Sequence, residues 1–574
     1  MTPELIANSL NLETTESASV SGQPYLDVLR QLSAAFPKPV SDRMHDSYFA
    51  FSFLRALDQV DALKSARPLL GEPIDVAYET AQQRCVETEP QAPEDVTRQM
   101  VEYLEGMMIL GHPQTQINVG PSPTIPSIIG GLLPSIYNPN LVSDESSRRV
   151  AIAEVEAISM TAGLLGYDPE SAGGVFTFGG TGTLLYAARI GLEKAFPGSR
   201  KTGILAPAVI ICSDKAHYAA CTVAGWMGIG EDSVVQVATG EDNDICLDDY
   251  GRKLRRVLES GRRVACIIAT TGTTDAFGLD DVQGMRRIRD ELVEELGLDY
   301  HPHLHADAVI GWAWSVFRDY EFDRNELGFR PRTIRALAGT NRRIRHLADA
   351  DSIGVDYHKT GFAPYVSSAV IFKHREDLGQ MARDAGSMPY LFQSGSYHPG
   401  KFTLETTRSG TGPMAALANL RLFGKKGLRS LLGHLVSMAE ELRERLEGHA
   451  ATTVLNGGNF GPVTLFRVYP EGVDTFSMPK LEQDDPQYRN QLRAHNEYNR
   501  RIFELIHQEA LQGNAVLLSM TDCYRETSYG EPIVALKSYI MSPFSRPDHC
   551  DSVLRSISKA RAVLASEDAL RVGA

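Results

Sequence analysis

The sequence has few cysteines for its length and no close pair of them. The seven cysteines are an odd number without a Cys-x-x-Cys pair, so neither a disulfide framework nor a structural zinc site is indicated. Thiols that stay reduced fit this pattern, and we expect a cytoplasmic protein with no bound metal. The cysteines stand singly at Cys85, Cys212, Cys221, Cys246, Cys266, Cys523 and Cys550.

Long apolar runs and an excess of basic charge are also missing. No stretch reaches the roughly 20 apolar residues that span a bilayer. The first residues lack the basic region and apolar core of a signal peptide. The formal net charge of −15 argues against a general binder of nucleic acid or anionic membrane. We therefore expect neither partner.

The length of 574 residues exceeds one compact core, so two or three structural units are expected. Helical spacing of apolar residues predicts a helical N-terminal segment over 1–111, which includes a helix over 101–110. Alternating strands and helices predict a large domain over 112–425. A mixture of both elements predicts a smaller α+β domain over 426–574.

The large domain is predicted to be an α/β fold with a mostly parallel sheet and helices on both faces. Apolar strands are expected over 208–212, 264–269, 303–310, 353–356 and 367–373, with helices over 146–165, 184–194 and 282–296. Ligands of such sheets bind beyond the carboxyl ends of the strands. His217, Thr274 and Lys359 lie at or just past such ends, and Asp307 lies within its expected strand.

Lys359 follows a buried strand directly and precedes a Gly-Phe-Ala-Pro turn. Burial there is expected to lower its pKa and to free its amine for attack on a carbonyl, as a Schiff-base lysine requires. The alternative is a lysine that extends from the strand end into solvent.

A glycine-rich stretch, residues 173–183, opens a predicted helix. Glycines at a helix start allow backbone N–H groups to surround an anion, and the helix dipole favours it. The stretch fits neither the Walker pattern nor the dinucleotide GxGxxG spacing, so a plain tight turn is an equal alternative.

Three further patterns leave alternatives open. The proline-rich stretch 112–140 is expected to be a surface loop or the wall of a binding site. His301, His303 and His305 share one face of an expected strand, but no carboxylate or thiolate set nearby supports a metal. An insert over 321–346 is either a solvated helix face or a carboxylate-binding or subunit-contact surface. Its arginines are Arg324, Arg330, Arg332, Arg335, Arg342, Arg343 and Arg345.

Taken together, these motifs resemble the group II pyridoxal-phosphate-dependent decarboxylases, which act on glutamate, cysteine sulfinate, aspartate and aromatic amino acids. The resemblance covers roughly residues 110–430 and rests on six motifs in the family's order. These are His112-Pro113 with Asn138-Pro139-Asn140, the stretch Phe178–Thr183, His217, Thr274, His305-Ala306-Asp307-Ala308 and Asp356-Tyr357-His358-Lys359.

The resemblance implies the type I fold of these transferases, pyridoxal phosphate as cofactor, and a role for each motif. Lys359 would form the Schiff base, Asp307 would pair with the pyridine nitrogen, and His217 would stack on the ring. The phosphate would be held by Gly179, Gly180, Thr181 and His358, and Thr274 would face the substrate side of the cofactor.

The resemblance also implies where the substrate binds. Gln116, Asn118 and His112 would contact it. Tyr390-Leu391-Phe392-Gln393 with Tyr397 resembles the flexible loop of the glutamate and cysteine-sulfinate members. Tyr397 would protonate Cα after carbon dioxide leaves, with Tyr390 as the alternative. The protein would be a homodimer in which the loop 388–412 reaches the partner's site.

The expected activity is decarboxylation of an L-amino acid, with a preference for acidic ones because of this loop. Aromatic or diamino acids stay open, as does a carbon–carbon lyase of the sphingosine-phosphate-lyase type. That lyase would need extra phosphate ligands, which the insert over 321–346 supplies in principle. A catalytically inactive scaffold is disfavoured by the lysine, aspartate and histidine together. Two departures from the family are Gly182, where many relatives carry a larger residue, and the long spacing from Asp307 to Lys359.

Overall fold

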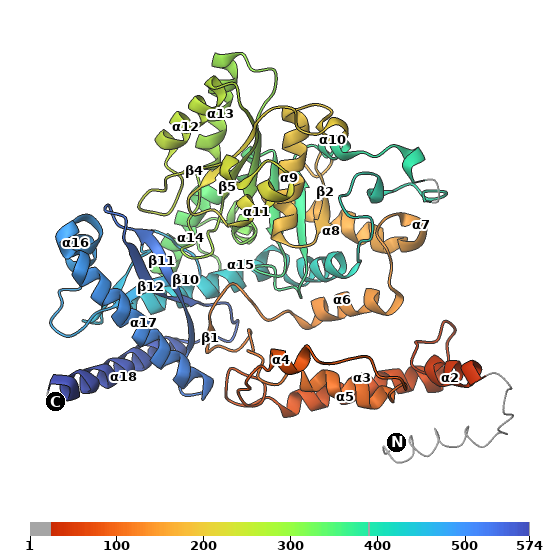
Figure 1. Cartoon of the computed structure of the whole chain (residues 1–574), viewed down its shortest axis with the longest axis horizontal. Coiled ribbons are helices and arrows are strands. Elements are labelled where there is room, and N and C mark those ends of the chain that lie inside the picture. Colours follow the sequence, from red (N-terminus) through yellow and green to blue (C-terminus); the bar gives the residue numbers. More distant parts are fainter. Residues whose placement is uncertain (1–23, 389–390, 573–574) are drawn as a thin grey trace. The chain divides into compact units, whose positions relative to one another are not determined.

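The computed structural model describes residues 24–388 and 391–572, and these divide into two units (Figure 1). One unit takes the described residues up to 65 together with 69–107, and the other takes 66–68 and the described residues from 108 on. The predicted division into 1–111, 112–425 and 426–574 stays a prediction. In the described ranges, no helix has the length and apolar character of a membrane span.

The first unit consists of helices: α2 (Pro24–Ser33), α3 (Arg43–Ala62), α4 (Tyr78–Ala81) and α5 (Pro93–Glu102). The expected helix over 101–110 is wrong, because α5 ends at Glu102. Gly106 then adopts a left-handed backbone with φ of 77°, which turns the chain instead of continuing a helix.

The second unit contains a sheet of seven strands in the order β2-β8-β7-β6-β5-β3-β4 (Figure 1). Every neighbouring pair from β7 to β4 is parallel, whereas β8 is antiparallel to both β7 and β2. The mostly parallel sheet is therefore confirmed. Its strands are β2 (Gly173–Thr177), β3 (Ala208–Ser213), β4 (Val234–Val237), β5 (Arg263–Thr270), β6 (His303–Asp307), β7 (Ser352–Asp356) and β8 (Ser368–Phe372).

Helix α9 lies along this sheet and contacts β5, β6, β7 and β8. Together with α11 it buries alanine and leucine side chains against β3 and β5, including Leu184 and Ala188 against Ile210. A Cβ on Gly191 would collide with the carbonyl of Ala265, so only glycine allows α9 to approach β5 this closely. The helices and 3-10 turns from α6 to η6 are α6 (Ile125–Tyr137), α7 (Asp144–Ser147), α8 (Arg149–Leu165), α9 (Gly180–Ala195), α10 (Ser199–Thr202), α11 (Ala219–Trp226), η2 (Glu231–Ser233), α12 (Leu247–Glu259), α13 (Val282–Leu296), η3 (Gly311–Phe317), α14 (Pro331–Ile344), η4 (Leu347–Asp349), η5 (Arg375–Met381) and η6 (Ala385–Ser387).

A second sheet of five strands has the order β1-β11-β12-β10-β9. It is antiparallel except for β1, which pairs in parallel with β11, and α17 packs on β11 and β12. These elements confirm an α+β arrangement toward the C-terminus. They are β1 (Thr115–Gln116), η7 (Pro399–Lys401), α15 (Thr411–Glu447), β9 (Thr452–Val454), β10 (Val463–Val468), α16 (Met478–Asp484), η8 (Pro486–Tyr488), α17 (Arg489–Leu511), β11 (Leu517–Glu526), β12 (Pro532–Tyr539) and α18 (Pro547–Val572).

The stretch 112–140 is only partly a loop, contrary to expectation, because it contains β1 and the helix α6. Thr124 caps α6 by accepting a hydrogen bond from the Ser127 N–H at 3.2 Å. Pro126 lies in the first turn, where the missing N–H of proline costs no helical hydrogen bond. Asn138 ends the helix with a left-handed φ of 50°. The prolines therefore start and shape a helix here.

The arginine-rich insert folds largely as α14, and several of its arginines pair with carboxylates of the same chain. Arg332 binds Glu440 at 2.7 Å, and Arg343 binds Asp281 at 2.6 Å and Asp244 at 3.1 Å. Further pairs join Arg330 to Glu441 and Arg324 to Glu321. Arg335, Arg342 and Arg345 are exposed. The insert is thus partly a solvated face and partly a set of intramolecular ion pairs.

Candidate active site

Four strand ends of the large sheet meet at one edge, because β3, β5, β6 and β7 run in parallel. A cavity of about 410 Å³ opens there, and its lining includes His217, Thr274 and Asp307. Cys523 and Tyr524 of β11 contribute a wall from the second sheet. The structure therefore brings together three predicted site residues and adds two that the sequence did not indicate.

Asp307 is the last residue of β6, since that strand ends earlier than the expected 303–310. The side chain is buried, and its Oδ1 atom has no hydrogen-bond partner in the described part of the chain. Burial raises the pKa of Asp307 to about 6, although Lys359 nearby works in the opposite direction. A buried carboxylate oxygen that faces a cavity can accept a hydrogen bond from a donor group of a ligand.

Lys359 lies just beyond β7 and forms an ion pair with Asp356, with Nζ 2.8 Å from Oδ2. Burial works to lower the pKa of Lys359, but the carboxylates of Asp356 and Asp307 outweigh it, so this pKa is raised. The expected lowering is therefore wrong, because that expectation took account of burial without the carboxylate three residues earlier in the chain.

His358 is buried, and it approaches the same carboxylate of Asp356 as Lys359 does. Its Nδ1 atom lies 3.0 Å from the carbonyl oxygen of Ser367, and its Nε2 atom lies 3.5 Å from Asp356. Tyr365 contacts the other side of the ring, at 4.4 Å between centroids. Burial lowers the pKa of His358, so the ring is neutral at physiological pH.

His217 stands at the exposed rim of the cavity, four residues after β3. Its Nδ1 atom accepts a hydrogen bond from the Ala219 N–H at 3.1 Å, which leaves the proton on Nε2. Burial of the ring and the charge of Lys359 both lower its pKa. A neutral, flat ring at this position is suited to lie against another ring system.

The glycine-rich stretch forms β2 and then the start of α9. Gly179 has a φ of 117°, and α9 begins at Gly180 with Thr181 next. The first N–H groups of a helix lack partners within it and point outward, which suits an anion. A Cβ on Gly182 would lie 2.9 Å from the Cβ of Thr177. A larger residue at Gly182 would therefore need Thr177 to shift.

Replacing Gly179 with alanine is expected to weaken the binding of pyridoxal phosphate about tenfold and to cost about 1 kcal/mol of stability. A Cβ there would meet nothing within 4 Å, so the cost comes from the positive φ alone. Gly203 is the matched control, since its φ is 79° and its Cβ would also meet nothing within 4 Å. Gly203→Ala should lose similar stability in a thermal melt but keep wild-type affinity in a fluorescence titration. Equal affinities for both variants would contradict the anion role.

The predicted substrate residues lie elsewhere in the second unit. Gln116 is buried, and its Oε1 atom accepts a hydrogen bond from Ser538 at 2.6 Å. His112 accepts a hydrogen bond from the Gln114 N–H, and burial and His549 lower its pKa. Asn118 is exposed. None of the three is among the residues that line the cavity, so their contact with substrate stays a prediction.

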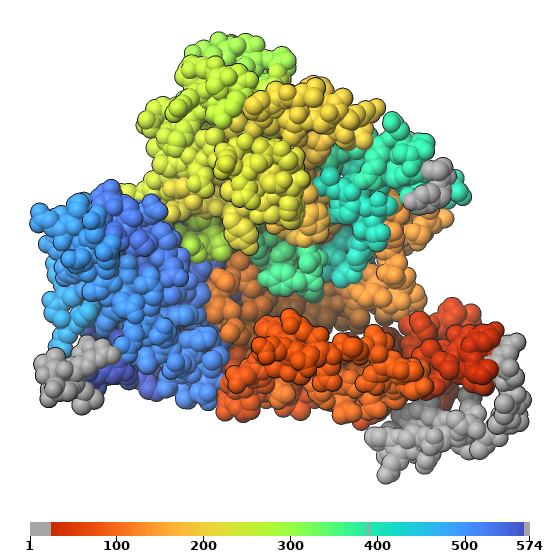
Figure 2. Space-filling view, viewed as in Figure 1, coloured from red at the N-terminus to blue at the C-terminus, as the bar shows by residue number. Residues whose placement is uncertain are grey.

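Tyr397 also lies outside the cavity lining, and Tyr390 falls outside the described residues. The Tyr397 carbonyl accepts a hydrogen bond from the Asp144 N–H at 2.9 Å, and its ring contacts Phe402. Asp144 in turn accepts the N–H of Ser396 at 3.1 Å. Figure 2 shows this loop at the surface beside the segment that holds α7. The loop is thus fastened to α7 on its own chain.

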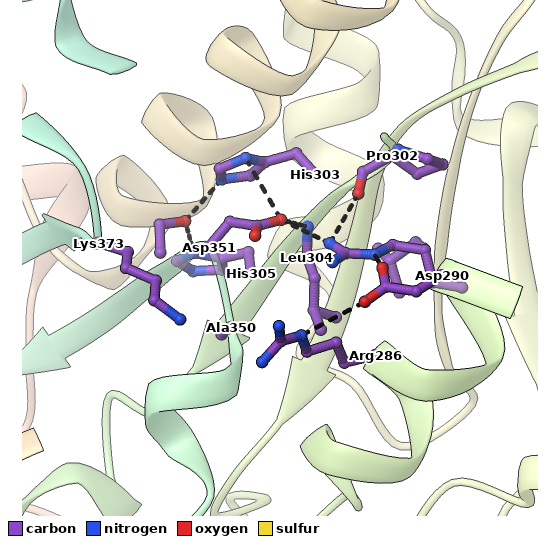
Figure 3. Close-up of polar contacts among 12 residues, drawn as sticks. Arg286, Asp290, Pro302, His303, Leu304, His305, Ala350, Asp351 and Lys373 are labelled. Atoms are coloured by element: carbon purple, nitrogen blue, oxygen red, sulfur yellow. Dashed lines mark hydrogen bonds and ion pairs between the residues drawn. The ribbon is translucent and has the colours of Figure 1, made fainter. Parts of the chain in front are cut away.

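The three histidines do not form a metal site. His301 precedes β6, whereas His303 and His305 both contact the Ser352 hydroxyl at 2.8 Å (Figure 3). Asp351 beside them binds Arg289 at 2.6 Å and the Leu304 N–H at 2.8 Å. No group of metal-binding side chains occurs within the described ranges. These residues form a buried polar network inside the sheet.

Sequence patterns missed several residues around the site. Asp356 was noted only as part of a motif, although i,i+3 spacing around a turn placed it within reach of Lys359. Lys537 and Asp275 form an ion pair of 2.9 Å beside the cavity, and Tyr365 covers His358. The Lys537–Asp275 pair joins distant segments, so no local pattern could reveal it. Trp312 and Trp314 are buried.

A comparison with protein families decides what this arrangement is. The family model described as "Pyridoxal-dependent decarboxylase conserved domain" matches residues 78–468, which is more than half of the chain. The chain belongs to this family.

Similar members of the pyridoxal-dependent decarboxylase family have different substrates in their names. L-2,4-diaminobutyrate decarboxylase of Rhizobium meliloti is 25% identical over 60% of this chain and 64% of its own length. Aspartate 1-decarboxylase of Aliivibrio fischeri is 26% identical over 54% of this chain and 55% of its own length. Both matches thus span less than two thirds of the relative.

A solved structure shows the same fold. It is the glutamate decarboxylase domain of diaminobutyrate-pyruvate transaminase and L-2,4-diaminobutyrate decarboxylase from Vibrio parahaemolyticus. The TM-score is 0.70 at 18% identity, and the match covers 93% of this chain and 99% of that chain. The type I fold expected for pyridoxal-dependent decarboxylases is therefore confirmed.

The residues of this chain fit pyridoxal phosphate, the cofactor of the decarboxylase family. The start of α9 at Gly180 offers N–H groups to a phosphate. The unpartnered Oδ1 of Asp307 would accept a hydrogen bond from the N–H of a pyridinium ring. Lys359 follows β7 at the same sheet edge, and its charge lowers the pKa values of both Asp307 and His217, so its amine is the group available to anchor the cofactor there.

Proposed function

We propose that this chain is a pyridoxal-phosphate-dependent α-decarboxylase that converts an L-amino acid to the corresponding amine and carbon dioxide. The observation that carries the proposal is the buried Asp307 carboxylate, whose Oδ1 atom has no hydrogen-bond partner in the described residues, at the same sheet edge as Lys359 and His217. Membership of the decarboxylase family supports it. The same residues make an inactive scaffold a poor explanation, since a buried carboxylate oxygen without a hydrogen-bond partner costs stability unless a ligand supplies one.

The bound cofactor supplies an electron-accepting ring for the electron pair that remains on Cα when carbon dioxide leaves. Asp307 would hold a proton on the pyridine nitrogen and thereby increase that capacity. His217 would cover one face of the ring and exclude water from it. Lys359 would anchor the cofactor through its amine. Thr274 at the cavity wall orients groups on the substrate side.

We further propose a homodimer in which the loop carrying Tyr397 supplies the acid that protonates Cα in the partner's cavity. Tyr397 lies outside the cavity lining of its own chain, which is consistent with a role at another copy. Burial, together with the charge of Glu154, raises the pKa of Tyr397, so the phenol keeps its proton at neutral pH. A protonated phenol is the form that a proton donor requires. The expected location is the cytoplasm.

The proposed substrates are acidic amino acids, on the basis of the loop that resembles glutamate and cysteine-sulfinate enzymes. Relatives named for aspartate and for 2,4-diaminobutyrate keep both an acidic and a cationic side chain in consideration. The lyase alternative loses support, because Arg330, Arg332 and Arg343 of the insert already pair with carboxylates of their own chain.

The purified protein with pyridoxal phosphate is expected to release carbon dioxide from aspartate, glutamate or cysteine sulfinate. The panel should also contain 2,4-diaminobutyrate, tyrosine and a phosphorylated amino alcohol, with heat-treated protein as the control. Manometry or trapped labelled carbon dioxide measures the rate. Release from only the diamino or aromatic acids would keep the reaction and overturn the acidic preference. Cofactor binding without release from any amino acid would overturn the decarboxylase proposal.

A further inference from the structure

Hydrogen bonds hold Asp356 in place beside Lys359. Its Oδ2 atom pairs with Lys359 at 2.8 Å, and its Oδ1 atom accepts a hydrogen bond from the Ser368 hydroxyl at 2.6 Å. The backbone carbonyl of Asp356 accepts a hydrogen bond from Trp312 Nε1 at 3.0 Å. The side chain is 1% exposed, so water cannot replace Lys359 as its partner. Side chain and backbone are therefore both fixed.

The same carboxylate lies against the start of α9. A Cβ on Gly180 would lie 3.2 Å from Oδ2 of Asp356, and Nε2 of His358 is 3.5 Å from that oxygen. The phosphate of the cofactor is expected at this helix start. Asp356 thus lies between the Lys359 amine, which would bond the cofactor aldehyde, and the start of α9, where the negatively charged phosphate would bind.

The bond between a lysine and an aldehyde starts from the neutral amine, because an ammonium has no lone pair to donate. One C=N bond then replaces the C=O bond, one water leaves, and the amine has given up the proton of its ammonium form. The ion pair with Asp356 favours the ammonium form of Lys359. The ammonium proton therefore needs an acceptor before the amine can bond the aldehyde.

We propose that Asp356 is a positioning residue that holds the cofactor-free Lys359 as an ammonium and accepts its proton when the lysine bonds the cofactor aldehyde. The inference rests on the role of Lys359 in the proposed function. Phosphate arriving at the start of α9 adds negative charge beside the carboxylate and so favours the transfer of the proton to it. Asp356 thereby couples phosphate binding to release of the amine.

Other groups around Lys359 are less suited to this task. Asp307 also faces the lysine, but its free oxygen is needed for the pyridine nitrogen. Tyr365 faces it with a phenol whose pKa burial raises, so the phenol is already protonated. His217 and His358 both feel the charge of Lys359, and burial lowers the pKa of each ring. Asp356 is the anion in direct contact.

The first test measures the reactivity of Lys359 in the cofactor-free protein with acetic anhydride, read by peptide mass spectrometry. Asp356→Asn is expected to increase labelling of Lys359 about tenfold at about pH 8, since loss of the anion leaves burial to lower the lysine pKa. Asp356→Glu should keep labelling near the wild-type rate. Equal labelling of Lys359 in wild type and Asp356→Asn would overturn the inference.

A surface pair provides the matched control. Lys425 binds Asp319 at 2.6 Å, and both side chains are 57% exposed. Asp319→Asn should change the labelling of Lys425 less than about twofold, because solvent screens exposed ion pairs. The other lysines in each peptide map report on folding, since a misfolded variant would label faster at every buried lysine.

The second test measures how fast Lys359 captures added pyridoxal phosphate, with borohydride used to trap the bond and mass spectrometry to count it. The pH profile of capture should move to lower pH in Asp356→Asn and return toward wild type in Asp356→Glu. A purely structural role would change the amount of folded protein but leave the midpoint of this profile unmoved, and that outcome would overturn the inference. Neither test uses an amino-acid substrate, so failure of the decarboxylation assay would leave both results intact.

Discussion

Replacing Lys359 with alanine is expected to lower carbon dioxide release by at least about 10³-fold, which corresponds to roughly 4 kcal/mol of barrier. Lys359 is the amine at the carboxyl end of β7, beside both Asp307 and the start of α9. Without it the cofactor loses its covalent anchor and the substrate loses the exchange that brings its amine to the ring. The rate is measured with the best amino acid of the panel at saturating pyridoxal phosphate.

The control for this variant is Lys373→Ala. Lys373 is partly buried and donates a hydrogen bond to the Ala348 carbonyl at 3.0 Å, but it follows β8, which runs antiparallel to β7, so it lies at the opposite edge of the sheet from Lys359. The activity of Lys373→Ala should stay within about twofold of wild type, because a substitution away from the site changes little. Borohydride should fix the cofactor to wild type and Lys373→Ala but not to Lys359→Ala. Activity of Lys359→Ala near the wild-type level would contradict the assignment of the lysine.

Replacing Asp307 with asparagine is expected to lower kcat by about 10²–10³-fold, since it removes a charge placed where electron density develops. The amide is nearly the same size as the carboxylate, so the cavity keeps its shape. Cofactor should still be trapped at Lys359 by borohydride. A small loss in kcat with unchanged KM would show that the pyridine nitrogen has another partner.

The same substitution should stabilise the protein when cofactor is absent. The pKa of Asp307 is raised from 3.8 to about 6, so its protonated form favours folding below about pH 4, and that stability is lost as pH rises through about 6. The amide of the Asp307→Asn variant has no charge to bury, and the gain at about pH 8 should reach about 3 kcal/mol.

Urea unfolding of cofactor-free protein at about pH 4 and pH 8 measures this gain. The control is Asp214→Asn, since Asp214 is an exposed carboxylate on the same cavity. Its stability should change by less than about 0.5 kcal/mol at either pH. No difference between wild type and Asp307→Asn at the higher pH would mean that water or a neighbour satisfies the Asp307 carboxylate.

Local sequence patterns predicted a helix of the large domain and both of its ends. The helix expected over 282–296 is α13 with the same ends, where Asp281 caps the first turn and Gly297 ends it in a left-handed conformation. Helix α15 breaks at Gly424, whose φ is 51°. Caps and glycines act over a few residues, which is why the sequence reveals them.

Contacts between distant segments were harder to foresee. Lys359, Asp307, His217 and Thr274 could be assigned to one sheet edge, since the rule for parallel strands places all their strand ends together. The raised pKa of Lys359 depends instead on the direction in which the Asp356 side chain points after β7. The wall formed by Cys523 depends on how the second sheet folds back over the first, which no spacing in the chain expresses.

That wall lies beyond the part of the chain that the family model matches. The match ends at residue 468, whereas Cys523 and Tyr524 stand at the cavity more than fifty residues later. Substitutions in β11 would therefore reshape this wall while Lys359 and Asp307 stay as they are. A library that varies residues 521–526 tests whether the substrate preference changes with the wall.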